Sequence, residues 1–307
     1  MKLYESELLH EGAMWSGSTG RMQQLTKLFF RLLNRSINIG NKSDANAGIR
    51  PIKPVALKPT RPLYIVGDVH GHIPALEVLL EQINADVQAN GFDDSQLIFL
   101  GDLIDRGEHS ADVLKRVQGL CAELPDMVVC LKGNHEHMML GFLDNPERFG
   151  PGWLKSGGLQ TAASFGVRDL RTSMPNEALV RLATDVRSAM PPGQEAWLRS
   201  LPLMHQDGNI LCVHAAADPA LPPDIQEERI LLWGHEGFMR AHRSDSLCVV
   251  HGHTIVDTPL HAPTRIAVDT GAYFSGVLTA AKISPLGDLR FLQTNPESLN
   301  RAGFAGG

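Results

Sequence analysis

The middle of the chain alternates short apolar runs with segments in which apolar residues recur at helical spacing. The runs "LYIVG" (63–67), "QLIFLG" (96–101) and "MVVCLKG" (127–133) each end in glycine, and such runs predict buried strands. Between them, 74–89 and 110–122 carry apolar residues every three or four positions, which predicts two helices. The order strand, helix, strand, helix, strand predicts parallel pairing and an α/β fold.

The second half of the chain offers further elements of both kinds. Segments 278–284 and 289–294 are expected to be antiparallel strands of a second sheet. Two helical stretches, 153–165 and 176–200, are expected to form a lid or wall on one side of a site.

The N-terminal part has a different character. Apolar residues at helical spacing, with basic residues between them, predict a short amphipathic helix from Gln23 to Ser36. Such a helix can lie on a membrane surface, or dock on the protein itself or a second subunit, and the sequence leaves these open. A segment rich in Pro, Asn and Lys follows and predicts a linker. We therefore divide the chain into an arm (1–60), a main domain (61–295) and a disordered tail (296–307).

Composition narrows the class of protein. A hydrophobic content of 43% in 307 residues can supply a sizeable core. The 28 Lys and Arg against 34 Asp and Glu give a net charge of −6, so we expect no nucleic-acid partner. The 4 cysteines lack metal-binding spacing and lie mostly in apolar runs, which favours reduced, buried thiols in a cytoplasmic protein. No apolar run approaches the roughly 20 residues of a membrane span.

Polar residues gather where the three predicted strands end. Asp68 and His70 follow the first strand, Asp102 the second, and Asn134 the third. If these strands are neighbours, the side chains share one crevice, because the carboxyl ends of parallel strands lie at the same edge. Two carboxylates packed together would repel each other, and a divalent cation removes that repulsion.

Two histidines complete the candidate metal site. His214 and His253 each come directly after a later apolar run. A mixture of carboxylate, amide oxygen and imidazole suits manganese, iron or zinc better than calcium. Together with the four strand-end residues they are enough for two ions that share one bridging carboxylate.

The motifs resemble a known family. In order, "GDVHG", "GDLIDRG", "GNHE", a single strand-end His and a later "GH" are similar to the signature of the binuclear phosphoprotein phosphatases within the calcineurin-like metallophosphoesterases. "WLKSGGLQTAASFG", "LLW" and "RIAVDTGAYFSG" resemble the short bacterial and phage serine/threonine protein phosphatases of that family. The resemblance covers roughly 61–295 as a catalytic domain. It implies a four-layer α/β/β/α sandwich with a dinuclear metal site at strand C-termini.

The resemblance also implies a role for each strand-end residue. Six of them would be metal ligands: Asp68 and His70 for the first ion, Asp102 as the bridge, and Asn134, His214 and His253 for the second. The neighbouring His251 should face the opposite way, because side chains alternate along an extended segment. The implied ions are two divalent metals, manganese first, with iron or zinc as alternatives.

The remaining implied roles concern substrate and proton transfer. His135 would be the general acid, Asp105 would orient it, and Arg106 would bind the phosphate. The implied reaction is direct attack of a metal-bridging hydroxide on phosphorus. A phosphoprotein or phosphopeptide, with phosphate on Ser, Thr or Tyr, is the implied substrate. A symmetrical dinucleoside polyphosphate hydrolase is the alternative enzyme, although that branch usually shows different first and second motifs. A scaffold protein that keeps the fold without catalysis is the third reading.

The chain departs from the family at one position. Relatives often carry a second phosphate-binding arginine shortly after the "LLW" tryptophan, where this chain has His235 and then Arg240 and Arg243. Three readings stay open: His235 substitutes for it, one of these arginines reaches in, or phosphate is held more weakly.

Overall fold

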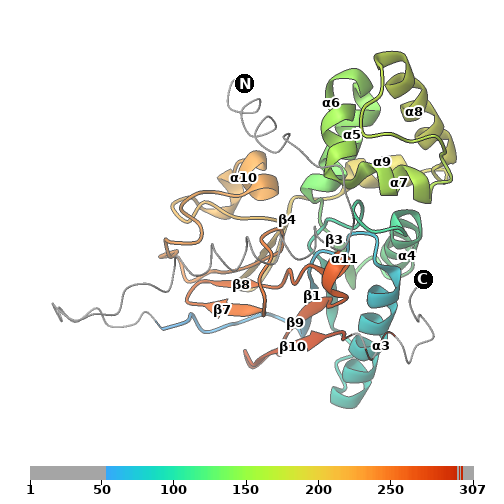
Figure 1. Ribbon diagram of the computed structural model, residues 1–307. Helices are drawn as coiled ribbons and strands as arrows, with labels where there is room; N and C mark the ends of the chain where they lie inside the picture. Colours follow the sequence, from blue (N-terminus) through green and yellow to red (C-terminus); the bar gives the residue numbers. More distant parts are fainter. Residues whose placement is uncertain (1–52, 296, 298, 300–307) are drawn as a thin grey trace, which may run out of the picture. The chain divides into compact units, whose positions relative to one another are not determined.

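The computed structural model describes residues 53–295, 297 and 299. The predicted helix from Gln23 to Ser36 and most of the predicted tail lie outside the described residues. Within the described residues, two five-stranded sheets and their flanking helices form the body of the protein (Figure 1). No helix in this part of the chain is long and apolar enough to cross a bilayer.

The first sheet contains the three strands predicted to be parallel. Its order in space is β10 (Leu289–Gln293), β9 (Thr279–Ile283), β1 (Leu63–Val66), β2 (Gln96–Phe99) and β3 (Val128–Cys130). β1, β2 and β3 pair in parallel. Two helices, α3 (Ile73–Asn90) and α4 (Ser110–Glu123), connect them. The predicted α/β order is therefore confirmed, with boundaries that differ by at most three residues.

One prediction about this sheet was wrong. β9 and β10 were expected in the second sheet, but β9 pairs antiparallel with β1, and β10 with β9. All five residues of β9 are buried, because the strand occupies the free edge of β1. Alternation of apolar residues identifies a strand but does not say which sheet edge the strand joins, so the sequence pattern could not assign β9 and β10 to the correct sheet.

The second sheet is also mixed. Its order is β4 (Met204–Asp207), β5 (Ile210–Val213), β6 (Cys248–His251), β8 (Arg265–Ala267) and β7 (Leu260–Ala262). The three central strands are parallel, and β4 and β7 pair antiparallel at the edges. The strands that precede His214 and His253 are therefore neighbours, and their carboxyl ends lie at one edge.

Buried apolar residues show four layers. Residues such as Ile65, Ile98, Cys212 and Val250 pack between the two sheets. The opposite face of the first sheet packs against α3 and α4, and the opposite face of the second sheet packs against α10 (Glu228–Trp233). This is the α/β/β/α arrangement that was expected. All four cysteines are free, and three of them are buried.

A group of helices follows β3 and lies together in Figure 1. It contains α5 (Asn134–Asp144), α6 (Pro146–Trp153), a π-helical segment (Leu154–Gly158), α7 (Leu159–Ser164), α8 (Asn176–Ala189) and α9 (Gln194–Ser200). The predicted helix 176–200 is interrupted between α8 and α9 by the sequence "MPPG" (190–193), because proline and glycine end a helix. A short 3₁₀ turn, Pro223–Ile225, precedes α10.

The described end of the predicted linker is bound to the second sheet. The Lys58 amide donates to Asn209 Oδ1 at 2.7 Å, and Asn209 Nδ2 donates to the Ala56 carbonyl at 2.9 Å. Gly208 beside it has φ of 54°, and a Cβ there would lie 1.9 Å from the Lys58 carbonyl oxygen. The turn between β4 and β5 can therefore hold this segment only with glycine at 208.

Candidate metal centre

The backbone at the strand ends is held in an unusual conformation. Five residues singled out from the motifs have left-handed φ values, namely His70 (45°), Asp102 (49°), Asp105 (71°), Arg106 (68°) and His253 (60°). In the part of the chain that the structure describes, only two other residues besides glycine share this conformation. It costs roughly 1–3 kcal/mol for each such residue and persists only where the surroundings enforce it. The loops that follow the strands are thus shaped for the side chains they carry.

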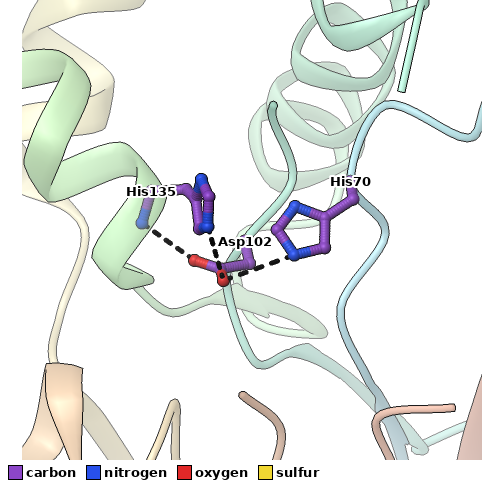
Figure 2. Close-up of side chains that lie close together, drawn as sticks. All are labelled: His70, Asp102 and His135. Atoms are coloured by element: carbon purple, nitrogen blue, oxygen red, sulfur yellow. Dashed lines mark hydrogen bonds and ion pairs between the residues drawn. The ribbon is translucent and has the colours of Figure 1, made fainter. Parts of the chain in front are cut away.

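Asp102 lies at the centre of these side chains and is buried. Its Oδ2 atom is 3.4 Å from Nε2 of His214, 3.6 Å from Nε2 of His70 and 3.9 Å from Nε2 of His135. Its Oδ1 atom accepts a hydrogen bond of 3.0 Å from the backbone amide of His135 (Figure 2). One carboxylate from the loop after β2 therefore faces three imidazoles that come from three other segments.

Asn134 joins the other side of the cluster. Its Oδ1 atom lies 2.7 Å from Nε2 of His214 and 2.9 Å from Nδ1 of His253. The rings of His214 and His253 meet edge to face, with centroids 5.2 Å apart. His251 is buried against the ring of Phe238 instead, so the two histidines of this segment do face opposite ways.

Backbone carbonyls fix which ring nitrogens are free. Nδ1 of His70 lies 2.7 Å from the carbonyl oxygen of Ile104, and Nδ1 of His214 lies 3.0 Å from that of Leu100. Each Nδ1 therefore carries the proton, which leaves the Nε2 lone pair directed at the carboxylate of Asp102. Metal-binding histidines commonly donate their second N–H to a backbone carbonyl in this way. Lone pairs that converge without a donor between them fit a cation.

Charge in the cluster agrees with this arrangement. Burial is the largest influence on the imidazoles, and it lowers the pKa of His70 and His214 and brings that of His253 to about 4. Burial also acts to raise the pKa of Asp102, but the surrounding imidazoles, His214 foremost, bring it below its ordinary value. These directions describe a carboxylate that ionises readily and imidazoles that lose their proton readily, and both tendencies favour the protonation states that bind divalent metals.

The described residues include two groups of three side chains, and within each group the ligating atoms all lie within 4.8 Å of one another. They are His70, Asp102 and His135, and Asp102, His214 and His253. Asp102 belongs to both groups, as a bridging ligand would. His135, which was expected to be the acid and not a ligand, belongs to the first group.

Asp68, expected as a ligand of the first ion, belongs to neither of these groups. Its carboxylate accepts the backbone N–H of His253, at 3.2 and 3.0 Å from the two oxygens. Burial raises the pKa of Asp68, and the nearby Asp269 raises it further. Sequence reasoning missed Asp269, which is buried and accepts the backbone N–H of Gly271 at 2.9 Å. Its position directly after the apolar run "RIAV" was the signal that could have identified it.

His135 and Asp105 form a closely held pair. Nδ1 of His135 lies 2.7 Å from Oδ2 of Asp105. The Asp105 carboxylate, fully buried, also accepts from Trp153 Nε1 at 3.1 Å and from Thr161 Oγ1 at 2.5 Å. Burial acts to lower the pKa of His135, but Asp102 and Asp105 raise it overall. The predicted helical stretch 153–165 thus supplies two side chains to the site that its helical spacing did not reveal.

Glu136 ties the loops after β2 and β3 together. Its carboxylate accepts the backbone N–H groups of Asp102 (2.9 Å), Leu103 (2.8 Å) and Gly133 (2.8 Å). The side chain is fully buried, and burial raises its pKa to about 7. Gly133 allows the two loops to approach, since a Cβ there would lie 2.2 Å from Asp102 Oδ1. Sequence reasoning quoted Glu136 in "GNHE" but gave it no role.

Arg106 lies beside the cluster and is half-buried. Its Cζ atom is 5.0 Å from the centre of the Tyr273 ring, and its backbone amide donates to the Gly157 carbonyl at 3.3 Å. Gly157 has φ of 115°, and a Cβ there would lie 2.5 Å from the Arg106 nitrogen. Glycine at 157 is therefore required for the wall segment to reach Arg106.

The residues considered in place of a second phosphate-binding arginine have other contacts. Nε2 of His235 lies 3.7 Å from Oδ2 of Asp218. Arg243 is buried, and its guanidinium donates to the Asp245 carboxylate and to the Asp218 carbonyl. Arg240 is exposed. His235 stays a prediction for substrate binding.

Comparisons with known proteins agree with a metal site of this kind. A family model described as "Calcineurin-like phosphoesterase" matches residues 61–257. The chain is 26% identical to the asymmetrical bis(5'-nucleosyl)-tetraphosphatase PrpE of Oceanobacillus iheyensis over 70% of this chain and 86% of that protein. It is 35% identical to a symmetrical bis(5'-nucleosyl)-tetraphosphatase of Acidovorax ebreus over 51% of this chain and 44% of that protein.

Two further comparisons support less, the first because it covers a short part of the chain and the second because its sequence identity is low. A serine/threonine-protein phosphatase of Arabidopsis thaliana, BSL2, is 31% identical over 32% of this chain and 10% of that protein. The crystal structure of a candidate diadenosine tetraphosphatase superposes with a TM-score of 0.52 at 21% identity, covering 80% of this chain and 99% of that one. This last likeness concerns the fold alone. The chain spans less than half the length of several curated proteins that it matches.

Proposed function

Since the chain belongs to the calcineurin-like phosphoesterases, a family of metal-dependent hydrolases, we propose that its substrate is a dinucleoside polyphosphate. The observation that best supports a metal-dependent hydrolase is that one carboxylate, Asp102, belongs to both groups of candidate metal-binding side chains. The choice of substrate is supported by the tetraphosphatases among its relatives, one of which it matches over 86% of that protein's length. The motifs led us to expect either phosphoproteins or dinucleoside polyphosphates as substrates, and the relatives favour dinucleoside polyphosphates.

In the proposed hydrolysis, one set of residues would hold the metal ions and Arg106 would bind phosphate. Two divalent ions would be held by Asp102, which belongs to both groups of ligating atoms, together with His70 in one group and His214, His253 and the Asn134 amide oxygen in the other. When bound, the ions supply a water of lowered pKa as the nucleophile and neutralise phosphate charge. The guanidinium of Arg106 offers a planar pair of donors to phosphate oxygens next to them.

His135 is placed to deliver a proton to the leaving group. Asp105 accepts the Nδ1 proton at 2.7 Å, so that Nε2 faces the cluster. Trp153 and Thr161 hold the Asp105 carboxylate, and the imidazole therefore keeps one orientation. A general acid fixed in this way contributes typically 10²- to 10⁴-fold to the rate.

The same pair supports a second candidate function, that of a phosphoprotein phosphatase. The alkoxide of serine or threonine is a strong base and leaves slowly unless it is protonated, whereas a nucleotide phosphate is a much weaker base. A general acid is therefore needed more for the alkoxide than for the nucleotide phosphate, and a histidine with a raised pKa beside a buried carboxylate can act as that acid. We keep phosphopeptides as the competing substrate for this reason.

One experiment separates the two. The purified full chain, loaded with manganese, is assayed side by side on diadenosine tetraphosphate and a phosphothreonine peptide, with Asp102→Asn as the inactive control. We expect a higher kcat/KM on the dinucleotide, and its products distinguish symmetrical cleavage (two ADP) from asymmetrical cleavage (ATP and AMP). Turnover confined to the peptide would support the phosphatase instead. Turnover of neither substrate would contradict both proposals.

A further inference from the structure

Aromatic side chains extend from the metal cluster toward solvent. The Tyr273 ring meets the His70 ring edge to face, with centroids 5.5 Å apart, and Arg106 lies over it. The Phe274 ring is 4.9 Å from the Tyr273 ring and is 52% exposed. Both aromatic residues belong to the short helix α11 (Ala272–Ser275). Histidine ligand, tyrosine and phenylalanine thus follow one another from the buried site to the surface.

The helix that carries the two rings is fixed at both ends. Gly271 and Gly276 adopt left-handed φ values of 67° and 69°, and the buried Asp269 accepts the Gly271 N–H at 2.9 Å. The Phe274 ring lies directly over Gly271, since a Cβ at Gly271 would be 2.3 Å from the ring. The ring is therefore positioned before any ligand arrives.

Phe274 differs from the other exposed apolar side chains. Among the large hydrophobic residues exposed in the described part of the chain, it is the only aromatic one. Leu286, 90% exposed, lies on the turn between β9 and β10. The exposed Phe274 ring contacts Tyr273, and the Tyr273 ring in turn lies against the Arg106 guanidinium, so a flat stacking surface and a cation for phosphates lie on either side of one tyrosine.

We infer that Phe274, supported by Tyr273, stacks on a nucleobase of the substrate while Arg106 and the metal ligands hold the phosphates. This inference rests on the proposed function and names the part of the substrate that the site distinguishes. It makes Phe274 a specificity residue for nucleotides over inorganic polyphosphate. Stacking of one base on an aromatic side chain corresponds to roughly tenfold in affinity or more.

Binding of two molecules that resist hydrolysis tests the inference. Isothermal titration calorimetry on the manganese-loaded protein gives Kd for α,β-methylene-ADP and for methylenediphosphonate, which lacks the nucleoside. We expect wild type to bind the nucleotide about tenfold more tightly or better. Phe274→Ala and Phe274→Leu should lose most of this ratio, because leucine keeps the bulk without the flat ring. Phe274→Trp should keep it, and so should the control Leu286→Ala.

The outcomes separate the inference from the function beneath it. If Phe274→Leu retains the wild-type ratio, or if both Kd values weaken equally in it, the inference is wrong. If wild type binds the two molecules equally well, it is wrong too. If the ratio behaves as expected while the enzyme cleaves phosphopeptides and not diadenosine tetraphosphate, the proposed function fails and the base-binding role of Phe274 stands.

Discussion

His135 takes part in two arrangements at once, and they imply different roles. Its Nε2 atom lies 3.9 Å from Oδ2 of Asp102, within a group that could bind an ion. Its Nδ1 atom is held at 2.7 Å by Asp105. The Asp105 carboxylate in turn accepts from two other side chains, Trp153 Nε1 and Thr161 Oγ1, which hold it in the position from which it orients the imidazole. We therefore propose that His135 transfers a proton and that Asp102 binds the metals.

Substitution of His135 by asparagine separates these roles. We expect His135→Asn to retain both ions and to lower kcat by about 10²- to 10³-fold, because the acid is lost and the ligands are kept. Metal content by atomic emission and kcat measured on the same preparation test this. His253→Asn, which alters the other group, is the comparison and should lose metal. A loss of metal in His135→Asn would show that His135 is a ligand.

At the scale of elements, α3 is fastened to the first sheet by a polar contact on its inner face. Asp86 of α3 lies 2.5 Å from Nζ of Lys282 in β9 and 2.5 Å from the hydroxyl of Tyr64 in β1. Lys282 and Tyr64 are buried, so their polar ends depend on this carboxylate. Burial acts to raise the pKa of Asp86, but Lys282 and Tyr64 bring it below its ordinary value.

Loss of this carboxylate should destabilise the fold. We expect Asp86→Ala to lower the free energy of unfolding by about 2–3 kcal/mol, less than for a fully buried pair because Asp86 is partly exposed. Urea unfolding measures it, with Glu81→Ala on the exposed face of α3 as a control that should change by less than about 0.5 kcal/mol.

The same substitution has an acid signature. A depressed pKa stabilises the fold above the ordinary value near 3.9 and loses that effect as pH falls through the folded value. The difference between wild type and Asp86→Ala should therefore shrink below about pH 4. An undiminished difference at pH 3 would contradict the ionic role of Asp86.

The elements also show where sequence reasoning succeeds. Strands β1 to β3 and helices α3 and α4 follow local periodicity, and His214 and His253 follow apolar strands, so each could be located from its own neighbours. Trp153 and Thr161 contact Asp105 from 48 and 56 positions away along the chain. Glu136 bridges two loops in a comparable way. Contacts of this kind are set by tertiary packing, and one chain's pattern does not contain them.

At the scale of the whole molecule, the candidate site joins the two sheets. Asp102 and Asn134 come from loops of the first sheet, while His214 and His253 follow strands of the second. An ion held by both sets would connect the sheets at the edge where their strands end. Metal binding and thermal stability should therefore be coupled, since a ligand that binds only the folded protein stabilises it.

Removal of metal tests this coupling. Protein treated with a chelator and dialysed should melt at a lower temperature, and manganese at 100 times Kd should restore about 2.7 kcal/mol for each site filled. Differential scanning calorimetry with and without manganese measures the shift. His253→Asn should show a smaller shift and Leu286→Ala the wild-type one. Equal melting temperatures with and without metal would contradict a site that spans both sheets.

The left-handed residues at the strand ends have a consequence for how this sequence can change over time. Glycine would adopt those φ values more easily than the aspartates, histidines and arginine that occupy them. Mutations to glycine at 70, 102, 105, 106 or 253 would relax the backbone and remove the chemistry together. In a lineage that no longer needs the reaction, substitutions should therefore accumulate first at these positions. Glycine there in a homologue would indicate that the homologue has lost the catalytic activity.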